Sequence, residues 1–165
     1  MLFLCIVGLF SACRKKTEVI KTQVIDNVIY EVGGTAVYQD NSEKNKQKTN
    51  TQFISILHAN LFQTSISTSD LTNLSEVRTA IGDKQLADEL IINNNVHSSN
   101  VQIPTNQVMR ADIDDFVEAT YLRFFLRKPN AYEKYYLRQA IENDPQLTPE
   151  LIYTSFSISN EYKYY

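Results

Sequence analysis

The chain has 165 residues, with 16 basic and 19 acidic side chains and a formal net charge of −3. This length suits one domain and is too short for two large ones. The slight acidic excess argues against a nucleic-acid-binding protein, which normally carries a basic stripe. Only two His, two Cys and four Gly are present, so few residues could serve as metal ligands, reactive thiols or phosphate-loop glycines.

The N-terminal segment is almost entirely apolar. Residues 1–10 read MLFLCIVGLF, and the small residues Ser11 and Ala12 follow, then Cys13. Ten apolar residues are too few to span a bilayer, which takes about 20, but they match the apolar region of a signal peptide, about 7–15 residues. We therefore expect residues 1–12 to be a signal peptide.

The residues FSAC at positions 10–13 resemble the lipobox of bacterial lipoproteins of the Bacteroidota type. The resemblance implies that Cys13 is acylated and becomes the new N-terminus, so that the protein is exported and anchored in the envelope. Because Arg14, Lys15 and Lys16 form a basic tract where surface-exposed lipoproteins carry an acidic one, the resemblance favours the outer membrane, facing the periplasm. The alternatives are cleavage near Ala12, which leaves Cys13 as a free thiol, or a buried N-terminal segment.

Residues 13–50 are predicted to form a membrane tether. β-Branched residues cluster between residues 18 and 38, which favours short strands in a hairpin, although a helix is also compatible with the spacing. Residues 39–52, QDNSEKNKQKTNTQ, contain no apolar side chain. Without apolar burial to offset the entropy of ordering, this stretch is predicted to be a flexible linker.

From residue 51 onward the pattern is helical, and we expect a mainly α, compact multi-helix domain over residues 51–165. Three regions carry amphipathic faces and capping signals: residues 53–61, residues 71–95 and residues 105–158. In the last region, Thr105 predicts the start of one continuous helix that ends before Pro129. Asn130 with Glu133 then predicts a capping box, and Thr148 followed by Pro149 predicts a helix start. The residues expected to face inward are Phe53, Ile56, Leu57, Asn60, Leu61, Leu86, Leu90, Ile91, Met109, Ile113, Phe116, Val117, Thr120, Phe124, Tyr132, Tyr136, Leu137, Ala140, Ile141, Leu151, Ile152, Phe156 and Ile158.

The helical region contains an internal echo. FISILHANLF at residues 53–62 matches FVEATYLRFF at residues 116–125, an offset of 63, and ADELII at residues 87–92 matches TPELIY at residues 148–153, an offset of 61. Two pseudo-repeated halves would explain both matches. A chance likeness between amphipathic helices is the alternative.

No catalytic motif is recognisable. The densest acidic group is Asp112, Asp114, Asp115 and Glu118, but it has no nearby Gly to turn a calcium loop, so we interpret these acids as helix-dipole and solubility charges. We expect no enzymatic activity, no metal and no cofactor. The alternative is an envelope enzyme or small-ligand-binding subunit with a pocket between the two helical halves.

The C-terminal end is rich in tyrosine, since eight of the ten Tyr lie between residue 121 and the end of the chain. Tyr and Arg are frequent at interaction hot spots, so Tyr162, Tyr164, Tyr165 and Arg127 are predicted to bind a partner. The competing interpretation is that this segment packs on its own core.

The last 45 residues or so, from RFFLRKPN through YEKYYLRQAI and LTPELIYTSF to SNEYKYY, resemble a helical domain of bacterial envelope proteins and of phycobilisome-linker-like domains. The resemblance implies an assembly role. Together with the lipobox, it predicts a non-enzymatic scaffold or docking lipoprotein that acts on an envelope protein partner and contacts the membrane through its lipid.

Overall fold

A computed structural model describes residues 37–164, in which helices account for the regular structure. The expected signal peptide, the expected strands up to residue 36, Cys13 and Tyr165 lie outside the described residues. The predicted mainly α, compact multi-helix domain is confirmed. The described elements are η1 (Asn41–Glu43), α1 (Asn50–Phe62), α2 (Thr68–Ala80), α3 (Lys84–Val96), α4 (Asn106–Ala111), α5 (Ile113–Phe125), α6 (Ala131–Asn143), α7 (Pro149–Ile158) and η2 (Glu161–Lys163).

Side-chain caps set where the helices begin. Asn130 and Glu133 form the predicted capping box at α6, and Thr148 caps α7 with Pro149 in its first turn. The predicted continuous helix from Thr105 is interrupted, because Asp112 leaves the helical conformation and its carboxylate accepts a hydrogen bond from the Asp115 amide. The chain therefore forms a short α4 and a separate α5 there.

The structure contains two helical halves with the spacing of the sequence echo. Helices α1 and α5 are both 13 residues long and start 63 positions apart, at Asn50 and Ile113. Helices α2 and α6 are also both 13 residues long, with the same spacing from Thr68 to Ala131. Helices α1 and α5 each end at a left-handed residue, Gln63 and Leu126, both with φ of 55°. Helices α3 and α7 match at an offset of 61. The buried residues of α3 at matching positions are Asp88, Ile91, Ile92 and Val96, and those of α7 are Pro149, Ile152, Tyr153 and Ser157.

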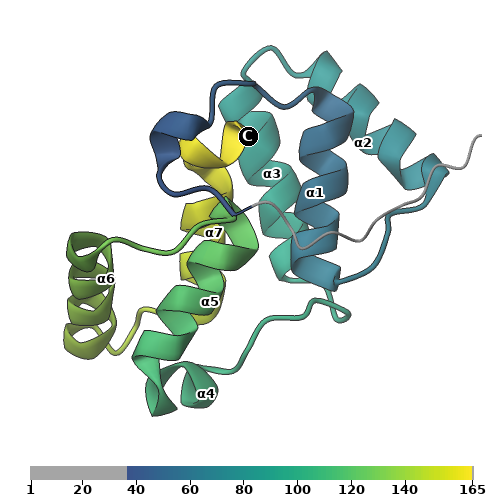
Figure 1. Ribbon diagram of the computed structural model, residues 1–165. Helices are drawn as coiled ribbons and strands as arrows, with labels where there is room; N and C mark the ends of the chain where they lie inside the picture. Colours follow the sequence, from purple (N-terminus) through teal and green to yellow (C-terminus); the bar gives the residue numbers. More distant parts are fainter. Residues whose placement is uncertain (1–36, 165) are drawn as a thin grey trace, which may run out of the picture. The chain divides into compact units, whose positions relative to one another are not determined.

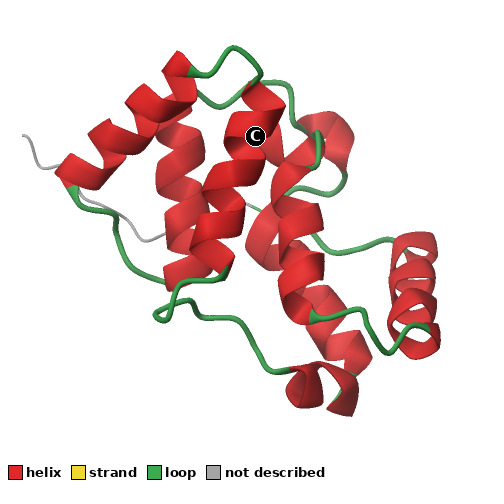
Figure 2. Ribbon diagram, turned by 180° about the vertical axis from the view of Figure 1, so that it is seen from behind, coloured by secondary structure: helices red, strands yellow, loops and turns green. Residues whose placement is uncertain are grey.

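The two halves share one hydrophobic core. Helix α1 packs on α2 and α3 in the first half, α5 packs on α6 and α7 in the second, and the equivalent helices α3 and α7 pack on each other between them (Figures 1 and 2). The fully or nearly fully buried apolar residues are Phe53, Ile54, Leu57, Leu61, Ala87, Ile91, Ile92, Val96, Met109, Phe116, Val117, Tyr121, Phe124, Phe125, Ile141, Ile152, Tyr153 and Tyr162. Of the helices in residues 37–164, none is long and apolar enough to cross a membrane.

Several residues predicted to face inward are exposed instead: Leu86 and Leu90 on α3, Tyr132, Tyr136 and Ala140 on α6, and Leu151 on α7. Leu86 and Leu90 are about half exposed, because α3 lies among α1, α2 and α7 and turns its Ala87 and Ile91 sides toward them. Tyr132 and Tyr136 are also exposed, since α6 has α5 as its main neighbour and covers it with Leu137 and Ile141. The 3.6-residue pattern gives several apolar stripes on each of these helices, and the neighbouring helices decide which stripe is buried.

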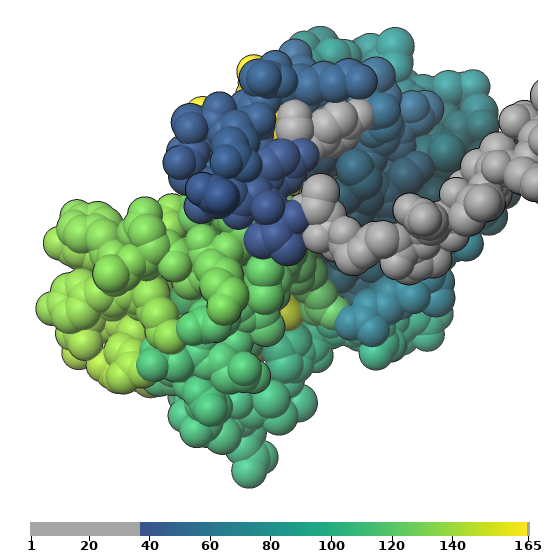
Figure 3. Space-filling view, viewed as in Figure 1, coloured from purple at the N-terminus to yellow at the C-terminus, as the bar shows by residue number. Residues whose placement is uncertain are grey.

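The predicted flexible linker over residues 39–52 is also wrong in the described part of the chain. The Tyr38 amide donates to the Leu126 carbonyl at 2.8 Å, and the Lys48 amide donates to the Lys163 carbonyl at 2.9 Å. The last residues of the stretch begin α1, where Thr49 and Gln52 form a capping box. Figure 3 shows the segment, in dark blue, lying against the second half of the domain. Distant backbone and charged partners order this segment in place of apolar burial.

Candidate functional site

The second half contains a buried guanidinium. Arg127 follows α5, and its side chain is only 4% exposed. Its guanidinium donates to both carboxylate oxygens of Glu133 at 2.7 and 2.8 Å and to both of Glu161 at 2.8 Å. We call Arg127, Glu133 and Glu161 the arginine cluster. Bidentate hydrogen bonds of this kind fix the orientation of the guanidinium and also pair its charge.

The charges of the arginine cluster stabilise one another. The hydrogen bonds that Arg127 donates to Glu133, and then those to Glu161, raise the pKa of Arg127. The hydrogen bond from Arg127 lowers the pKa of Glu133. Burial opposes ionisation of Glu161, but hydrogen bonds from Arg127 and Lys44 leave its pKa below the ordinary value. All three groups are therefore charged at neutral pH.

Aromatic rings and a lysine complete the surroundings of the cluster. The Arg127 guanidinium lies 5.1 Å from the ring centroid of Tyr121 and 5.7 Å from that of Phe125. Lys44, from the segment before α1, bonds to Glu161 at 2.9 Å and lies 5.0 Å from the Phe125 ring. The cluster thus joins four stretches of chain, and this role is structural.

Tyr162 and Arg127, which the sequence predicts to bind a partner, are both buried in the described structure. Tyr162 is fully buried, its ring lies 5.8 Å from those of Phe53 and Phe124, and its hydroxyl accepts a hydrogen bond from Asn60 at 3.0 Å. The η2 turn folds this ring inward, so the competing interpretation, packing on the protein's own core, describes the C-terminal segment. Tyr164 is 38% exposed and forms a bridge with Gln47, and Tyr165 lies outside the described residues.

The exposed aromatic surface is instead on α6. Tyr132, Tyr135 and Tyr136 are 68%, 57% and 54% exposed, and Tyr136 contacts the other two with ring centroids 4.3 and 5.5 Å away. We call these three residues the tyrosine face. The spacing i, i+3, i+4 was visible in the sequence, but it indicates only that the three residues share a side of the helix, without indicating which side is buried.

The acidic residues near the start of α5 form ion pairs with α6. Lys134 lies 2.7 Å from Glu118, and Arg138 contacts Asp114 through two nitrogens. These hydrogen bonds lower the pKa of Asp114 and of Glu118. Among residues 37–164, no group of three or more potential metal ligands converges on one point.

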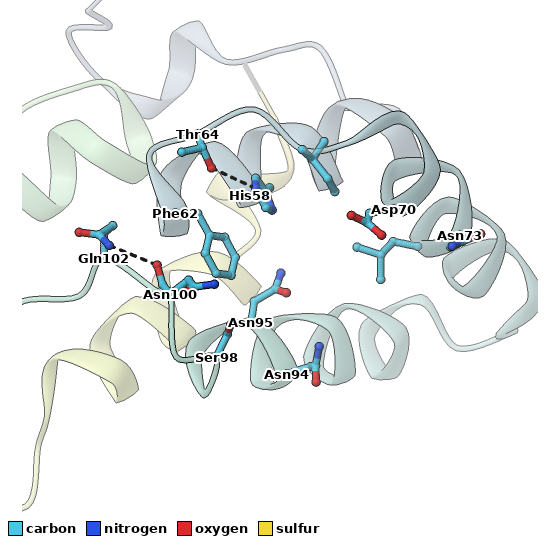
Figure 4. A pocket seen from close by; sticks show the side chains of 12 residues that line it. His58, Phe62, Thr64, Asp70, Asn73, Asn94, Asn95, Ser98, Asn100 and Gln102 are labelled. Carbon is cyan, nitrogen blue, oxygen red and sulfur yellow. Dashed lines mark hydrogen bonds between the residues drawn. The ribbon is translucent and has the colours of Figure 1, made fainter.

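A cavity lies within the first half. It has a volume of about 700 Å³, is open to solvent, and is lined by residues of α1, α2, the end of α3 and the loops that follow α1 and α3. Figure 4 shows His58 and Phe62 on one side and Asp70 on the other. The remaining lining is mostly amide and hydroxyl groups: Thr64, Asn73, Asn94, Asn95, Ser98, Asn100 and Gln102, with Ile66 and Leu74.

The polar groups of the cavity are arranged around one ring pair. The rings of His58 and Phe62 stack with centroids 4.5 Å apart and an interplanar angle of 25°. Burial lowers the pKa of His58, with nearby Asp70 acting in the opposite direction. The Asp70 carboxylate accepts a hydrogen bond from the Ser67 hydroxyl, and the Asp70 backbone amide donates to the Ser67 hydroxyl oxygen, which caps the start of α2. A second cavity of about 460 Å³, which Gln63, Arg123 and Tyr153 help to line, lies between the halves, where the alternative prediction placed a pocket.

A scan against protein-family models, a search of curated proteins and a search of solved structures each returned no match to this chain.

Proposed function

We propose that the protein is a non-enzymatic lipoprotein of the bacterial envelope, acylated at Cys13, whose helical domain docks a protein partner through the tyrosine face. The lipobox-like FSAC supports the anchor, and the basic tract after it supports the outer membrane, facing the periplasm. The docking surface differs from the one expected from the sequence, because Tyr162 and Arg127 are buried.

The observation that carries the proposal is the exposure of three adjacent tyrosines. Tyrosine provides a large contact area at low entropic cost, and the cores of protein interfaces are enriched in aromatic residues and depleted of charge. On α6 the cations Lys134 and Arg138 are paired with acids of α5. The tyrosine face therefore adds no unpaired cation for anionic lipid headgroups, and a protein surface suits it better than the bilayer.

Membrane anchoring makes a small docking surface sufficient. Confinement of both partners to one membrane raises their effective concentration, so that modest affinity gives stable association. Two or three acyl chains at Cys13 would hold the protein firmly, since each buried CH₂ contributes about 0.8 kcal/mol.

Two experiments test this function. Incorporation of labelled fatty acid into the wild type and into Cys13→Ala tests the anchor, and an unlabelled wild type would contradict it. For docking, a photo-crosslinking residue replaces Tyr135, and the crosslinked protein is identified, purified and titrated against the lipoprotein. Tyr132→Ser with Tyr136→Ser should abolish this binding, whereas Tyr164→Ser, the matched exposed tyrosine, should preserve it. Crosslinks to lipid alone, or equal binding by both variants, would refute docking through α6.

The alternative function, a ligand-binding accessory subunit, is supported by one observation, the 700 Å³ cavity of the first half.

A further inference from the structure

The cavity of the first half and the arginine cluster of the second half occupy equivalent places in the two halves. Phe62 and Asp70 lie 63 positions before Phe125 and Glu133. The helices that carry these residues, α1 and α5 and then α2 and α6, begin with the same spacing. An aromatic ring and a carboxylate are thus present at matching positions in both halves.

The differences between the two places are specific. Thr64 stands where the second half has Arg127, and Asn100 stands where it has Glu161, at the offset of 61 that relates α3 to α7. Asn95 corresponds in the same way to Phe156, whose ring stacks on Phe125 at 4.7 Å. The first half therefore lacks the guanidinium and the bulky ring that fill this place in the second half.

The second half shows what such a place accommodates. There a guanidinium lies beside the Tyr121–Phe125 ring pair and donates to two carboxylates. The first half keeps a ring pair, His58 with Phe62, keeps one carboxylate, Asp70, and offers the amide oxygens of Asn95 and Asn100 as acceptors. A cavity of about 700 Å³ lies among them, within the usual range for small-ligand sites of about 300–1,000 Å³.

We propose that this cavity binds the guanidinium group of an arginine-bearing ligand. The guanidinium stacks on Phe62 and pairs with Asp70, as the guanidinium of Arg127 lies beside Phe125 and pairs with Glu133. The two ionisable residues that line the cavity are His58 and Asp70. Since burial lowers the pKa of His58, its ring is uncharged at neutral pH and the lining carries one negative charge. A cation is favoured there over an anion, and the planar fork of a guanidinium fits the carboxylate and amide acceptors.

The test is a titration of the full-length protein with N-acetyl-arginine amide, in which the NMR shifts of the side-chain amides of Asn95 and Asn100 measure binding. The matched ligand is N-acetyl-citrulline amide, which has nearly the same shape without the charge. We expect the arginine compound to bind at least about tenfold more tightly, because a hydrogen bond to a charged group is stronger than one between neutral groups. Agmatine and a Gly-Arg-Gly peptide then distinguish a small free guanidinium compound from an arginine side chain in a peptide.

Three variants locate the binding. Asp70→Asn keeps an acceptor for Ser67 and should weaken binding at least about tenfold, whereas Glu76→Gln removes an exposed charge from the same helix outside the cavity and should have no effect. Thr64→Arg combined with Asn100→Glu introduces the residues of the second half, so the new arginine should fill the site and abolish binding. Equal affinity for arginine and citrulline, unchanged binding by Asp70→Asn or by the double variant, or no shift at about 10 mM ligand would overturn the proposal.

Discussion

Arg127 and Glu161 are 34 residues apart in the chain and form a two-pronged ion pair, with Nε to Oε1 and Nη2 to Oε2 both at 2.8 Å. The same guanidinium holds Glu133 at the start of α6, and Glu161 also holds Lys44 from the segment before α1. One buried cation therefore fixes the position of the C-terminal turn relative to α6 and to residues 37–48.

Arg127→Met is expected to lower the free energy of unfolding by about 3 kcal/mol, because removal of the buried cation leaves two partly buried carboxylates without their partner. Urea denaturation followed by circular dichroism measures this loss. Lys128→Met, which changes the exposed neighbour, should alter the free energy of unfolding by less than about 0.5 kcal/mol. Equal, small effects of the two substitutions would show that the cluster does not stabilise the fold.

A second buried ion pair marks a difference between the halves. Arg78 donates to Asp88 through Nη2 at 3.1 Å and through Nε, and both side chains are buried. The equivalent positions of the second half hold Ile141 and Pro149, so the same place is apolar there. Asp88→Ala alone should cost about 3–5 kcal/mol, because it leaves the Arg78 charge buried.

The double variant Arg78→Ile with Asp88→Ala should recover most of this loss, since replacement of a buried pair by apolar residues is often neutral. Thermal unfolding of the two single variants and the double variant forms the required cycle. A double variant as unstable as the sum of the single ones would contradict the equivalence of the two places.

The helices and the repeat were predictable because their signals are local. Caps such as Asn130 and Thr148 act within four residues, and matching 10-residue stretches lie in matching helices. Most buried positions of α1 and α5 follow from the apolar spacing of each helix, but Ile54, Tyr121 and Phe125 are buried outside the predicted faces. These features require only short-range rules and the 3.6-residue period.

The candidate sites were not predictable, because they depend on contacts between distant residues. Nothing near Lys44 in the sequence indicates that Glu161 will hold it, and a stretch without apolar side chains favours disorder. Likewise, Tyr132 and Tyr162 are the same residue type in similarly polar surroundings, yet one is exposed and the other is fully buried. The cavity around Asp70 is recognisable only after the two halves have been compared in space.

The stability of the protein should rise from about pH 8 to a maximum near pH 10. Burial, with the neighbouring Lys44, lowers the pKa of Lys48 from its ordinary value of 10.5 to about 8. Between these values the unfolded state binds more protons, so the free energy of unfolding increases with pH. Burial raises the pKa of Tyr121 to about 12, so above about pH 10 the unfolded tyrosine ionises first and stability decreases.

Urea denaturation at half-unit steps between pH 7 and 11 measures this profile. Lys48→Met should remove most of the rise between pH 8 and 10 and leave the decrease at higher pH. Lys48→Met also loses the contact with the Tyr162 carbonyl at every pH, which lowers the whole curve of unfolding free energy without changing its slope. A wild-type curve that is flat or falling between pH 8 and 10 would be inconsistent with a desolvated Lys48.

Tyr162 and Tyr164 should respond very differently to substitution, although only one residue separates them. Tyr162 is fully buried against Phe53 and Phe124, so Tyr162→Ala should cost about 3–5 kcal/mol. Tyr162→Phe keeps the ring and removes only the hydroxyl that accepts from Asn60, which should cost about 1 kcal/mol. Tyr164→Ala should change the free energy of unfolding by less than about 0.5 kcal/mol, because a substantial part of its side chain is exposed.

Deletion of residues 159–165 should destabilise the whole domain rather than remove a docking tail, because it removes the buried Tyr162. Thermal unfolding monitored by circular dichroism distinguishes the two outcomes. A truncated protein with the melting temperature of the full chain would show that Tyr162 does not belong to the core.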